Sequence, residues 1–367
     1  MPGDQSVADA IRHFIRRFVV VTDDQAVALT LWVLHTWAFE AATSTPYLAV
    51  MSPTWRSGKT RLLEVLECLV RQAFRAEGLT EAVMFRAIEQ MQPTLLLDEV
   101  DAIFGHASER TEPLRAAING GNRKGGQIAR CVPPNWDVKF FSVFCAKVLA
   151  GIDNGRWPDT VLDRSVVLRL QRRREGEEIE PFRFARVQVD AEPIRSAAED
   201  WAAEHLESLK SATPVLPTVL SDRASDAWEP LLAIAEALGD GWPQLGREAA
   251  ARLFYRQETL EDSAVMALLR DIRTIFEKSG ETKMTSAALT AKLRELSDSR
   301  WSAWGARRGK PGLTPNDLAM LLRPFEIGPR TVRLRSTGEP GSTAKGYTQG
   351  DFFDPWRRYL ADDGFPR

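Results

Sequence analysis

Short apolar runs alternate along the chain with longer stretches whose apolar residues have helical spacing. Four runs predict buried strands, because each is largely apolar and bounded by turn residues; they lie at residues 46–51, 94–97, 140–149 and 166–170. The intervening segments place leucine and valine three and four residues apart, as amphipathic helices do. Strands that alternate with helices predict an α/β fold with a parallel sheet covered on both faces.

Helix boundaries are also marked in the sequence. Residues 5–19 predict a first helix, and Thr22 with Gln25 has the spacing of a capping box for a second helix that runs to about residue 42. The second helix is apolar nearly all round, so other structure should cover it. A third helix is expected over residues 60–75, and Thr80 can cap a fourth.

The second half of the chain changes character. Residues 190–275 have a helical pattern almost throughout, whereas residues 281–367 predict two capped helices, from Thr285 and Thr314, and then a β-hairpin. This order suggests a winged-helix-like module. The predicted domains are N-terminal helices (1–45), the sheet-containing core (46–175), a helical lid domain (176–278) and the winged-helix-like domain (279–367).

Composition places this chain among ordinary globular proteins. It has 367 residues, 44% of them apolar and 27% charged, which allows two or three domains. With 48 basic and 50 acidic residues, the net charge of −2 excludes a uniformly basic, nucleic-acid-coating protein. Residues 121–174 nevertheless hold eleven basic and four acidic residues, a net of +7, and residues 281–367 hold fifteen and ten, a net of +5. Two basic zones can offer a focused surface to a polyanion.

Cysteine content and hydropathy indicate a compartment. Three sparse cysteines favour a reducing cytoplasm over a disulfide framework. The four histidines have no metal-ligand spacing. The longest apolar stretch, residues 26–41, contains His35 and Glu40 and is too short to span a bilayer, and the N-terminus lacks the apolar region of a signal peptide. We therefore expect a cytoplasmic protein without a membrane partner.

The strongest chemical signal is the segment at residues 52–60, which resembles the Walker A pattern G-x-x-x-x-G-K-[ST] with Pro53 at the first glycine position. Backbone N–H groups of such a loop cradle phosphates, Lys59 would reach the β- and γ-phosphates of ATP, and Thr60 would bind Mg²⁺. The alternative is a chance Gly-Lys-Thr. The expected nucleotide-binding residues here are Ser57, Gly58, Lys59, Thr60 and Arg61.

A partner motif follows 39 positions after Lys59. The apolar run 95–97 ends in Asp98 and Glu99, which is the Walker B arrangement. Asp98 would hold Mg²⁺, and Glu99 would orient or deprotonate the attacking water. The alternative is that the two carboxylates only cap the next element. We interpret Lys59, Asp98 and Glu99, with Arg164 discussed next, as the catalytic residues.

Three further polar residues are candidates for sensing nucleotide. Lys147, placed near the end of the third predicted strand, could contact the γ-phosphate, and Asn154 competes for that role. Arg164 precedes the fourth predicted strand, where it could act in a neighbouring subunit as an arginine finger. Its alternative is an ion pair with Asp159 or Asp163 within the chain. Arg223 could sense phosphate in its own chain or merely carry a helix-start charge.

Two basic segments are candidates for contact with DNA. Residues 119–130 interleave glycines with basic residues, and flexible basic loops can follow a nucleic-acid backbone. A tryptophan shortly after this loop could stack on a base; the alternative is a solvated loop and a core tryptophan. The candidate contacts are Arg123, Lys124, Arg130 and Trp136, with Arg333 and Arg335 in the terminal module.

Together these residues resemble a known family. The runs at 52–64, 93–101, 149–165, 222–231 and 345–352 are similar to an incompletely characterised P-loop ATPase family of phages, plasmids and integrated elements, domain of unknown function 3631, with an AAA+-like core close to superfamily-3 helicases. The resemblance covers about residues 31–360. It implies a role in replication beside a primase, which here would be a separate partner.

These observations predict an ATPase that uses ATP and Mg²⁺ and works as a DNA motor, a helicase for replication of a mobile element. If Arg164 acts on a neighbour, the protein self-associates into a ring, expected to be a hexamer, on single-stranded or forked DNA. One alternative is a nucleotide-switched DNA-binding initiator or loader that does not unwind. Another is an ATPase whose winged-helix-like module docks a protein.

Overall fold

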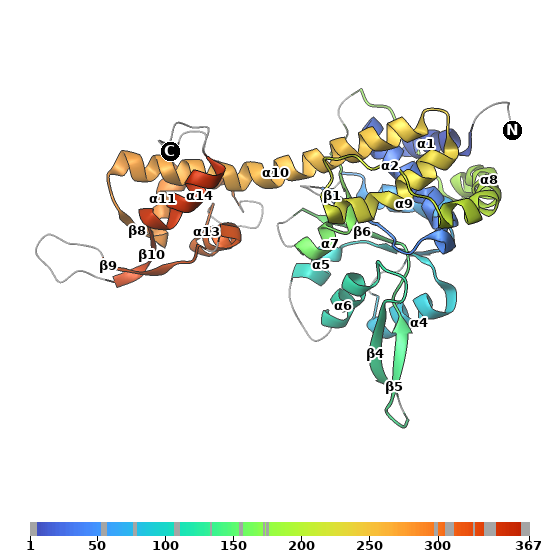
Figure 1. The fold of residues 1–367 in the computed structure, drawn as a ribbon, viewed down its shortest axis with the longest axis horizontal. Helices are drawn as coiled ribbons and strands as arrows, with labels where there is room; N and C mark the ends of the chain where they lie inside the picture. The colour runs from blue at the N-terminus through green and yellow to red at the C-terminus, as the bar shows by residue number, and fades with distance from the viewer. Residues whose placement is uncertain are drawn as a thin grey trace, which may run out of the picture. The chain divides into compact units, whose positions relative to one another are not determined.

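A computed structural model of the protein describes residues 6–52, 57–75, 79–105, 111–132, 134–153, 157–171, 173, 176–296, 300–304, 312–325, 327–333 and 343–360. The chain forms two compact units, residues 1–256 and 257–367 (Figure 1). Each unit has an apolar core of its own. The finer division into four domains that the sequence suggests stays a prediction.

A five-stranded parallel sheet organises the first unit, in the order β2-β3-β6-β1-β7. The strands are β1 (Tyr47–Ser52), β2 (Ala73–Arg75), β3 (Thr94–Leu97), β6 (Lys147–Ile152) and β7 (Ser165–Arg169). The predicted α/β class with a parallel sheet is therefore confirmed. The prediction extended the preceding helix to residue 75, whereas α3 (Lys59–Leu69) ends six residues earlier and the edge strand β2 takes up the last three residues.

Successive strand residues point to opposite sides of the sheet. Because both sets are apolar and buried here, helices cover both faces. In β1, Leu48 and Val50 enter one core, and Ala49 and Met51 enter the other. The first core is built with α1 (Val7–Phe18), α2 (Asp23–Trp37), η1 (Phe39–Ala41), α3, α8 (Phe184–Lys210), α9 (Asp222–Leu238) and the first turns of α10 (Trp242–Ser279). The second core is built with α4 (Glu81–Met91), α5 (Val100–Gly105), α6 (Glu112–Gly120) and α7 (Asp159–Leu162).

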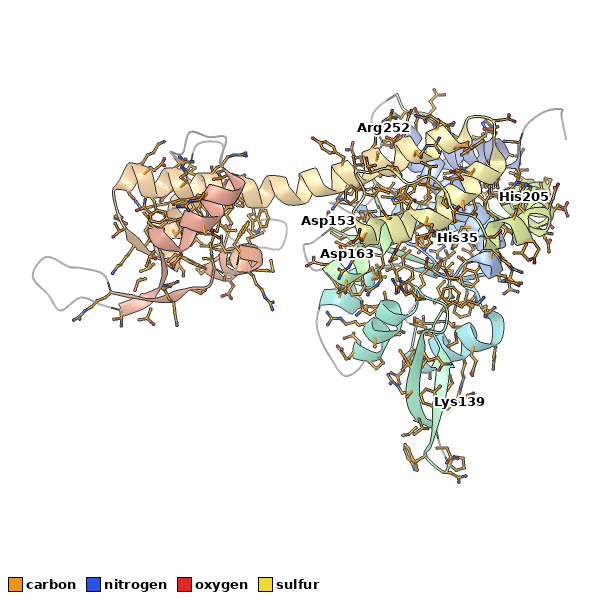
Figure 2. All side chains as sticks on the ribbon, in the orientation of Figure 1. His35, Lys139, Asp153, Asp163, His205 and Arg252 are labelled. Carbon is orange, nitrogen blue, oxygen red and sulfur yellow. The ribbon has the colours of Figure 1, made fainter. Side chains whose placement is uncertain are left out.

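The buried helix α2 begins where the sequence predicts. Thr22 and Gln25 form the expected capping box, in which each side chain bonds the other residue's backbone N–H. Near the other end of the helix, His35 is almost fully buried, and its Nε2 lies 2.9 Å from the Thr45 hydroxyl (Figure 2). Burial lowers the pKa of His35 to about 4, because the charged imidazolium would lose its hydration.

This histidine should make the protein less stable in mild acid. As the pH falls from about 6.5 to about 4, the unfolded chain protonates His35 and the folded chain does not, so the free energy of unfolding falls by about 3 kcal/mol in total. Replacing His35 with glutamine should flatten this part of the pH dependence. Urea unfolding of the wild type and of His35→Gln across that pH range measures the change, and equal slopes for the two proteins would contradict the assignment.

A two-stranded antiparallel hairpin projects from the first unit (Figure 1). It consists of β4 (Gln127–Val132) and β5 (Asp137–Ser142). The predicted strand over residues 140–149 is wrong, because that stretch contains the end of β5, a buried link and the start of β6. The link at residues 143–146 is apolar, so the hydropathy pattern runs through it without interruption.

The second unit contains a three-stranded antiparallel sheet in the order β8-β10-β9. Thr285 and Thr314 cap its helices as predicted. The elements are β8 (Lys283–Thr285), α11 (Ser286–Glu295), α12 (Arg300–Ala303), α13 (Pro315–Leu322), η3 (Arg323–Phe325), β9 (Arg330–Arg333), β10 (Thr343–Thr348), η4 (Gln349–Phe352) and α14 (Phe353–Tyr359). The winged-helix interpretation of this unit stays a prediction. Across the described ranges of both units, no helix is long and apolar enough to cross a bilayer.

Candidate functional site

The predicted motifs lie at the carboxyl ends of the parallel strands, which we call the carboxyl edge of the sheet. β1 ends at Ser52 and β3 ends at Leu97, and β6 lies between these two strands. Because all the strands are parallel, their carboxyl ends share that edge. Lys59 and Thr60 start the helix after β1, and Asp98 and Glu99 follow β3 directly. Residues 38 or more positions apart in the chain therefore meet at a single site.

The turn between β1 and α3 ends in a glycine with left-handed backbone geometry. Gly58 caps α3 with φ +86°, a conformation that an L side chain adopts only with strain. The Lys59 ammonium donates to the Ser52 hydroxyl over 2.6 Å, across the turn, and Ser57 in the same turn is buried. Pro53 lies in the predicted loop outside the described residues. The described part places a cation and the first N–H groups of a helix at the end of a buried strand.

Thr60 and Asp98 join the two motifs. The Thr60 hydroxyl donates to Asp98 Oδ2 over 3.0 Å, and Asp98 Oδ1 accepts the backbone N–H of Glu99 over 2.9 Å. Asp98 is half-buried, and the Glu99 side chain is exposed. Glu99 has φ +54°, which is costly for a residue with a Cβ, by about 1–3 kcal/mol, and is typical of functional sites.

This donor set suits Mg²⁺ bound together with phosphates. A hydroxyl and a carboxylate lie side by side, and Mg²⁺ prefers such oxygen ligands. Within the described ranges, no three His, Cys, Asp or Glu side chains gather in a way that could hold a metal by themselves. Mg²⁺ is commonly held by one or two carboxylates plus substrate phosphates and waters, and the Asp98 carboxylate with the Thr60 hydroxyl fits this manner of binding.

Two predicted nucleotide contacts have other partners in this structure. Arg61 forms an ion pair with Glu64 over 3.1 Å, and its guanidinium lies 4.3 Å from the centre of the Phe182 ring. Lys147 begins β6 and lies opposite Leu95 at the start of β3, so its expected place at the carboxyl end of the strand is wrong. Asn154, the competing candidate, lies outside the described residues.

Lys147 is instead a fully buried structural cation. Its ammonium donates to the carbonyl oxygens of Gly121, Val143 and Cys145 over 2.9–3.2 Å and lies 5.0 Å from the centre of the Tyr47 ring. Burial lowers its pKa, because desolvation disfavours the charged form. The ammonium thus holds the turn after α6 against the segment that enters β6.

Arg164 lies at the amino ends of the parallel strands, whereas Lys59 lies at their carboxyl ends. It directly precedes β7, and its carbonyl oxygen accepts the N–H of Tyr47 at the start of β1. Its guanidinium donates to the Thr160 carbonyl oxygen over 2.6 Å, and no carboxylate pairs with it in the described ranges. The alternative of an ion pair with Asp159 or Asp163 is therefore not what the structure shows. A strand of six residues such as β1 is about 20 Å long. Arg164 at the amino end therefore does not reach the Lys59 site at the carboxyl end of its own chain.

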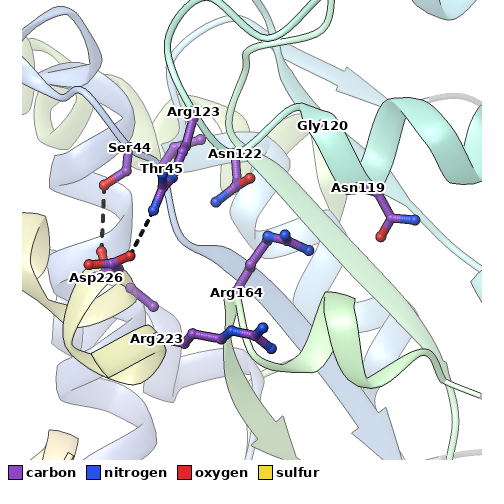
Figure 3. A pocket seen from close by; sticks show the side chains of 10 residues that line it. Ser44, Thr45, Asn119, Gly120, Asn122, Arg123, Arg164, Arg223 and Asp226 are labelled. Carbon is purple, nitrogen blue, oxygen red and sulfur yellow. Dashed lines mark hydrogen bonds and ion pairs between the residues drawn. The ribbon is translucent and has the colours of Figure 1, made fainter. Parts of the chain in front are cut away.

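Arg223 does not lie at the Lys59 site either. It forms an ion pair with Asp163, one of the two carboxylates considered as a partner for Arg164. Both residues belong to the edge of the sheet where β7 begins, so a phosphate-sensing role for Arg223 at the Lys59 site of the same chain is wrong on geometry. Figure 3 shows Arg223 and Arg164 lining the same pocket.

Two glycines of the basic glycine-rich segment are closely packed. A Cβ on Gly121 would overlap the carbonyl oxygen of Val143, and one on Gly126 would overlap that of Gly120. Gly121 and Gly126 are therefore required for close packing. Arg123 pairs with Asp226 over 3.0 Å, and Lys124 is exposed.

The other candidate DNA contacts are divided between the hairpin and the second unit. Arg130 on β4 lies 3.6 Å from a Glu81 carboxylate. Trp136, in the hairpin turn, is 68% exposed, so the alternative of a core tryptophan is wrong. Arg333, at the end of β9, is exposed, and Arg335 lies outside the described residues. Of these side chains, Trp136 is the most available for stacking.

Sequence reasoning assigned no role to two residues that complete these surfaces. Ser52 bonds Lys59 across the turn, and its place as the last residue of a strand before the motif could have marked it. Asp226 pairs with Arg123 from a helix more than one hundred residues further along the chain, and no local pattern marks that pairing.

Comparison with known proteins gives the family. A family model described as "Protein of unknown function (DUF3631)" matches residues 169–359, slightly more than half of the chain. The chain is also 33% identical over 194 residues to the "Uncharacterized 28.9 kDa protein in xis 5'region" of Saccharopolyspora erythraea, which covers 53% of this chain and 69% of that protein. The model match begins in β7, after both motifs at the sheet edge. The chain belongs to the family of unknown function DUF3631.

Proposed function

We propose that the protein is an ATPase that works as a DNA motor in the replication of a mobile element. The observation that carries the proposal is the Thr60–Asp98 hydrogen bond of 3.0 Å, because it brings the two predicted motifs together with oxygen ligands suited to Mg²⁺. The mobile-element context comes from the relative in the xis 5' region. The single exposed tryptophan of the projecting hairpin and the basic zones support contact with DNA.

Each residue has a distinct task in this proposal. Lys59 neutralises charge on the β- and γ-phosphates, and the N–H groups at the start of α3 bind their oxygens. Thr60 and Asp98 hold Mg²⁺, which would neutralise negative charge that develops in phosphoryl transfer. Glu99 accepts a hydrogen bond from the attacking water and orients it. Exchanging the Lys59–Ser52 bond for phosphate contacts would accompany nucleotide binding.

Arg164 would act on a neighbouring copy. It has no carboxylate partner in the described ranges, and it lies too far from the Lys59 site of its own chain. In a ring it would stabilise charge at the neighbour's nucleotide. Analytical ultracentrifugation of Glu99→Gln with ATP tests the ring: we expect an oligomer, and a monomer under those conditions would contradict it.

Steady-state ATP hydrolysis by the full chain, with and without single-stranded DNA, tests the motor. We expect DNA to stimulate hydrolysis severalfold, and Trp136→Ala to reduce the stimulation without lowering the basal rate. Hydrolysis that DNA does not change would contradict the motor and favour the nucleotide switch. A strand-displacement assay then separates a helicase from a translocating ATPase that does not unwind.

A further inference from the structure

A pocket rich in arginine lies at the edge of the sheet opposite the proposed nucleotide site (Figure 3). Its volume is about 340 Å³, and three arginines from distant parts of the chain line it: Arg123, Arg164 and Arg223. Asn119 and Asn122 add amide groups to the lining. The pocket lies at the amino ends of β1 and β7. There the backbone carbonyl oxygen of Asn122 accepts a hydrogen bond from the Thr45 N–H, and that of Arg164 accepts one from the Tyr47 N–H.

The charges of the pocket do not balance. Arg123 pairs with Asp226, Arg223 pairs with Asp163, and Arg164 bonds only a carbonyl oxygen among the described residues. Three guanidinium groups therefore face two carboxylates. A group with more than one negative charge would correct this imbalance, and a phosphate does so with oxygens that match the fork of arginine N–H donors.

The two carboxylates are weakly held partners. Side-chain exposure is 71% for Arg123 and 57% for Asp226, and it is 69% for Arg223 and 37% for Asp163. Ion pairs in such contact with water contribute little to stability. A phosphate can therefore replace either carboxylate at small cost.

Hydrogen bonds within the protein hold the backbone that carries Arg123. Residues 122–124 pair with residues 43–45 through two backbone hydrogen bonds, Thr45 N–H to Asn122 over 2.8 Å and Lys124 N–H to Thr43 over 2.9 Å. The buried Lys147 ammonium holds the adjacent Gly121 carbonyl. Rigid support of this kind is what a binding site needs to keep its donors in place.

We infer that this pocket binds a phosphate group, whose oxygens take the places of Asp226 and Asp163 beside Arg123 and Arg223 and also engage Arg164. The phosphate belongs either to a nucleotide or to a nucleic-acid backbone, which share this chemistry. The inference concerns a site separate from the Lys59 site of the same chain. The nucleotide of a neighbouring copy as the source rests on the proposed function, whereas a nucleic-acid backbone as the source does not.

Inorganic pyrophosphate at constant ionic strength is the probe, titrated calorimetrically into the full chain carrying Lys59→Ala, which removes the first predicted phosphate site. We expect binding that Arg164→Ala weakens at least fivefold and that Arg86→Ala, at an exposed arginine of α4 outside the pocket, leaves unchanged. Asp226→Asn should strengthen binding about threefold, because it removes a competitor for Arg123; a merely structural role would not predict a gain. Circular dichroism checks that each variant is folded.

No pyrophosphate binding, equal loss in Arg164→Ala and Arg86→Ala, or no gain in Asp226→Asn would overturn the inference. Two further arms identify the source of the phosphate. Displacement of pyrophosphate by single-stranded DNA indicates a nucleic-acid backbone. Recovery of ATP hydrolysis on mixing Lys59→Ala with Arg164→Ala chains indicates the nucleotide of a second copy.

Discussion

Replacing Lys59 with alanine should lower ATP hydrolysis at least about a hundredfold, the scale at which loss of a preorganised charge contact acts on a reaction. The ammonium lies at the end of β1 and bonds across the turn to Ser52. In the proposed function, its removal would leave the β- and γ-phosphates without their main counter-charge. The loss should appear in nucleotide affinity as well as in turnover, because the proposed contact would exist before and during the reaction.

Two variants make this result specific. Lys278→Ala removes an exposed lysine at the end of α10 and should leave hydrolysis unchanged. Glu99→Gln keeps the shape of the side chain but not its proton acceptor, so it should slow hydrolysis while ATP still binds. Steady-state phosphate release and equilibrium binding measure both effects. Hydrolysis by Lys59→Ala at the wild-type rate would show that the turnover comes from elsewhere.

Replacing Lys147 with alanine should destabilise the first unit by about 3–5 kcal/mol. The substitution removes a fully buried side chain and leaves three carbonyl oxygens without their donor. Lys147→Met should cost less, because it retains the volume and removes a desolvated charge. The free energy of unfolding in urea gives both values.

Lys139 is the matched control for Lys147, because it lies on the neighbouring hairpin, is half exposed and pairs with Glu89 over 3.1 Å (Figure 2). Removing it should cost no more than about 1 kcal/mol, as for other exposed ion pairs. If Lys147→Ala unfolded at the same urea concentration as Lys139→Ala, the buried ammonium would not hold the turn after α6.

Hydropathy and capping patterns were sufficient to predict a helix or strand where the element is long or its boundaries carry a chemical signal. The six buried residues of β1 end at a turn motif, and Thr22 with Gln25 marks the start of α2. The residues of β2 were assigned to the preceding helix because the strand has only three residues and directly follows a helical pattern. The third strand was misplaced because the apolar link at residues 143–146 hides the break before Lys147.

The site at the sheet edge was accessible to sequence reasoning because each of its motifs is local. Lys59 and Thr60 are adjacent, as are Asp98 and Glu99, and only the sheet order was needed to bring them together. The arginine pocket was not accessible in this way. Arg123, Arg164 and Arg223 come from three separate elements, and the carboxylates that pair with two of them are set by tertiary packing alone.

Equilibrium binding of ATP to the full chain, measured calorimetrically with Mg²⁺ and with an excess of chelator, tests the central claim most directly. We predict binding that Mg²⁺ strengthens at least about tenfold, that Thr60→Val weakens to the chelator level and that Thr282→Val, at an exposed threonine of the second unit, leaves unchanged. Absence of binding, or binding that depends on neither Mg²⁺ nor Thr60, would contradict a nucleotide site at the ends of β1 and β3.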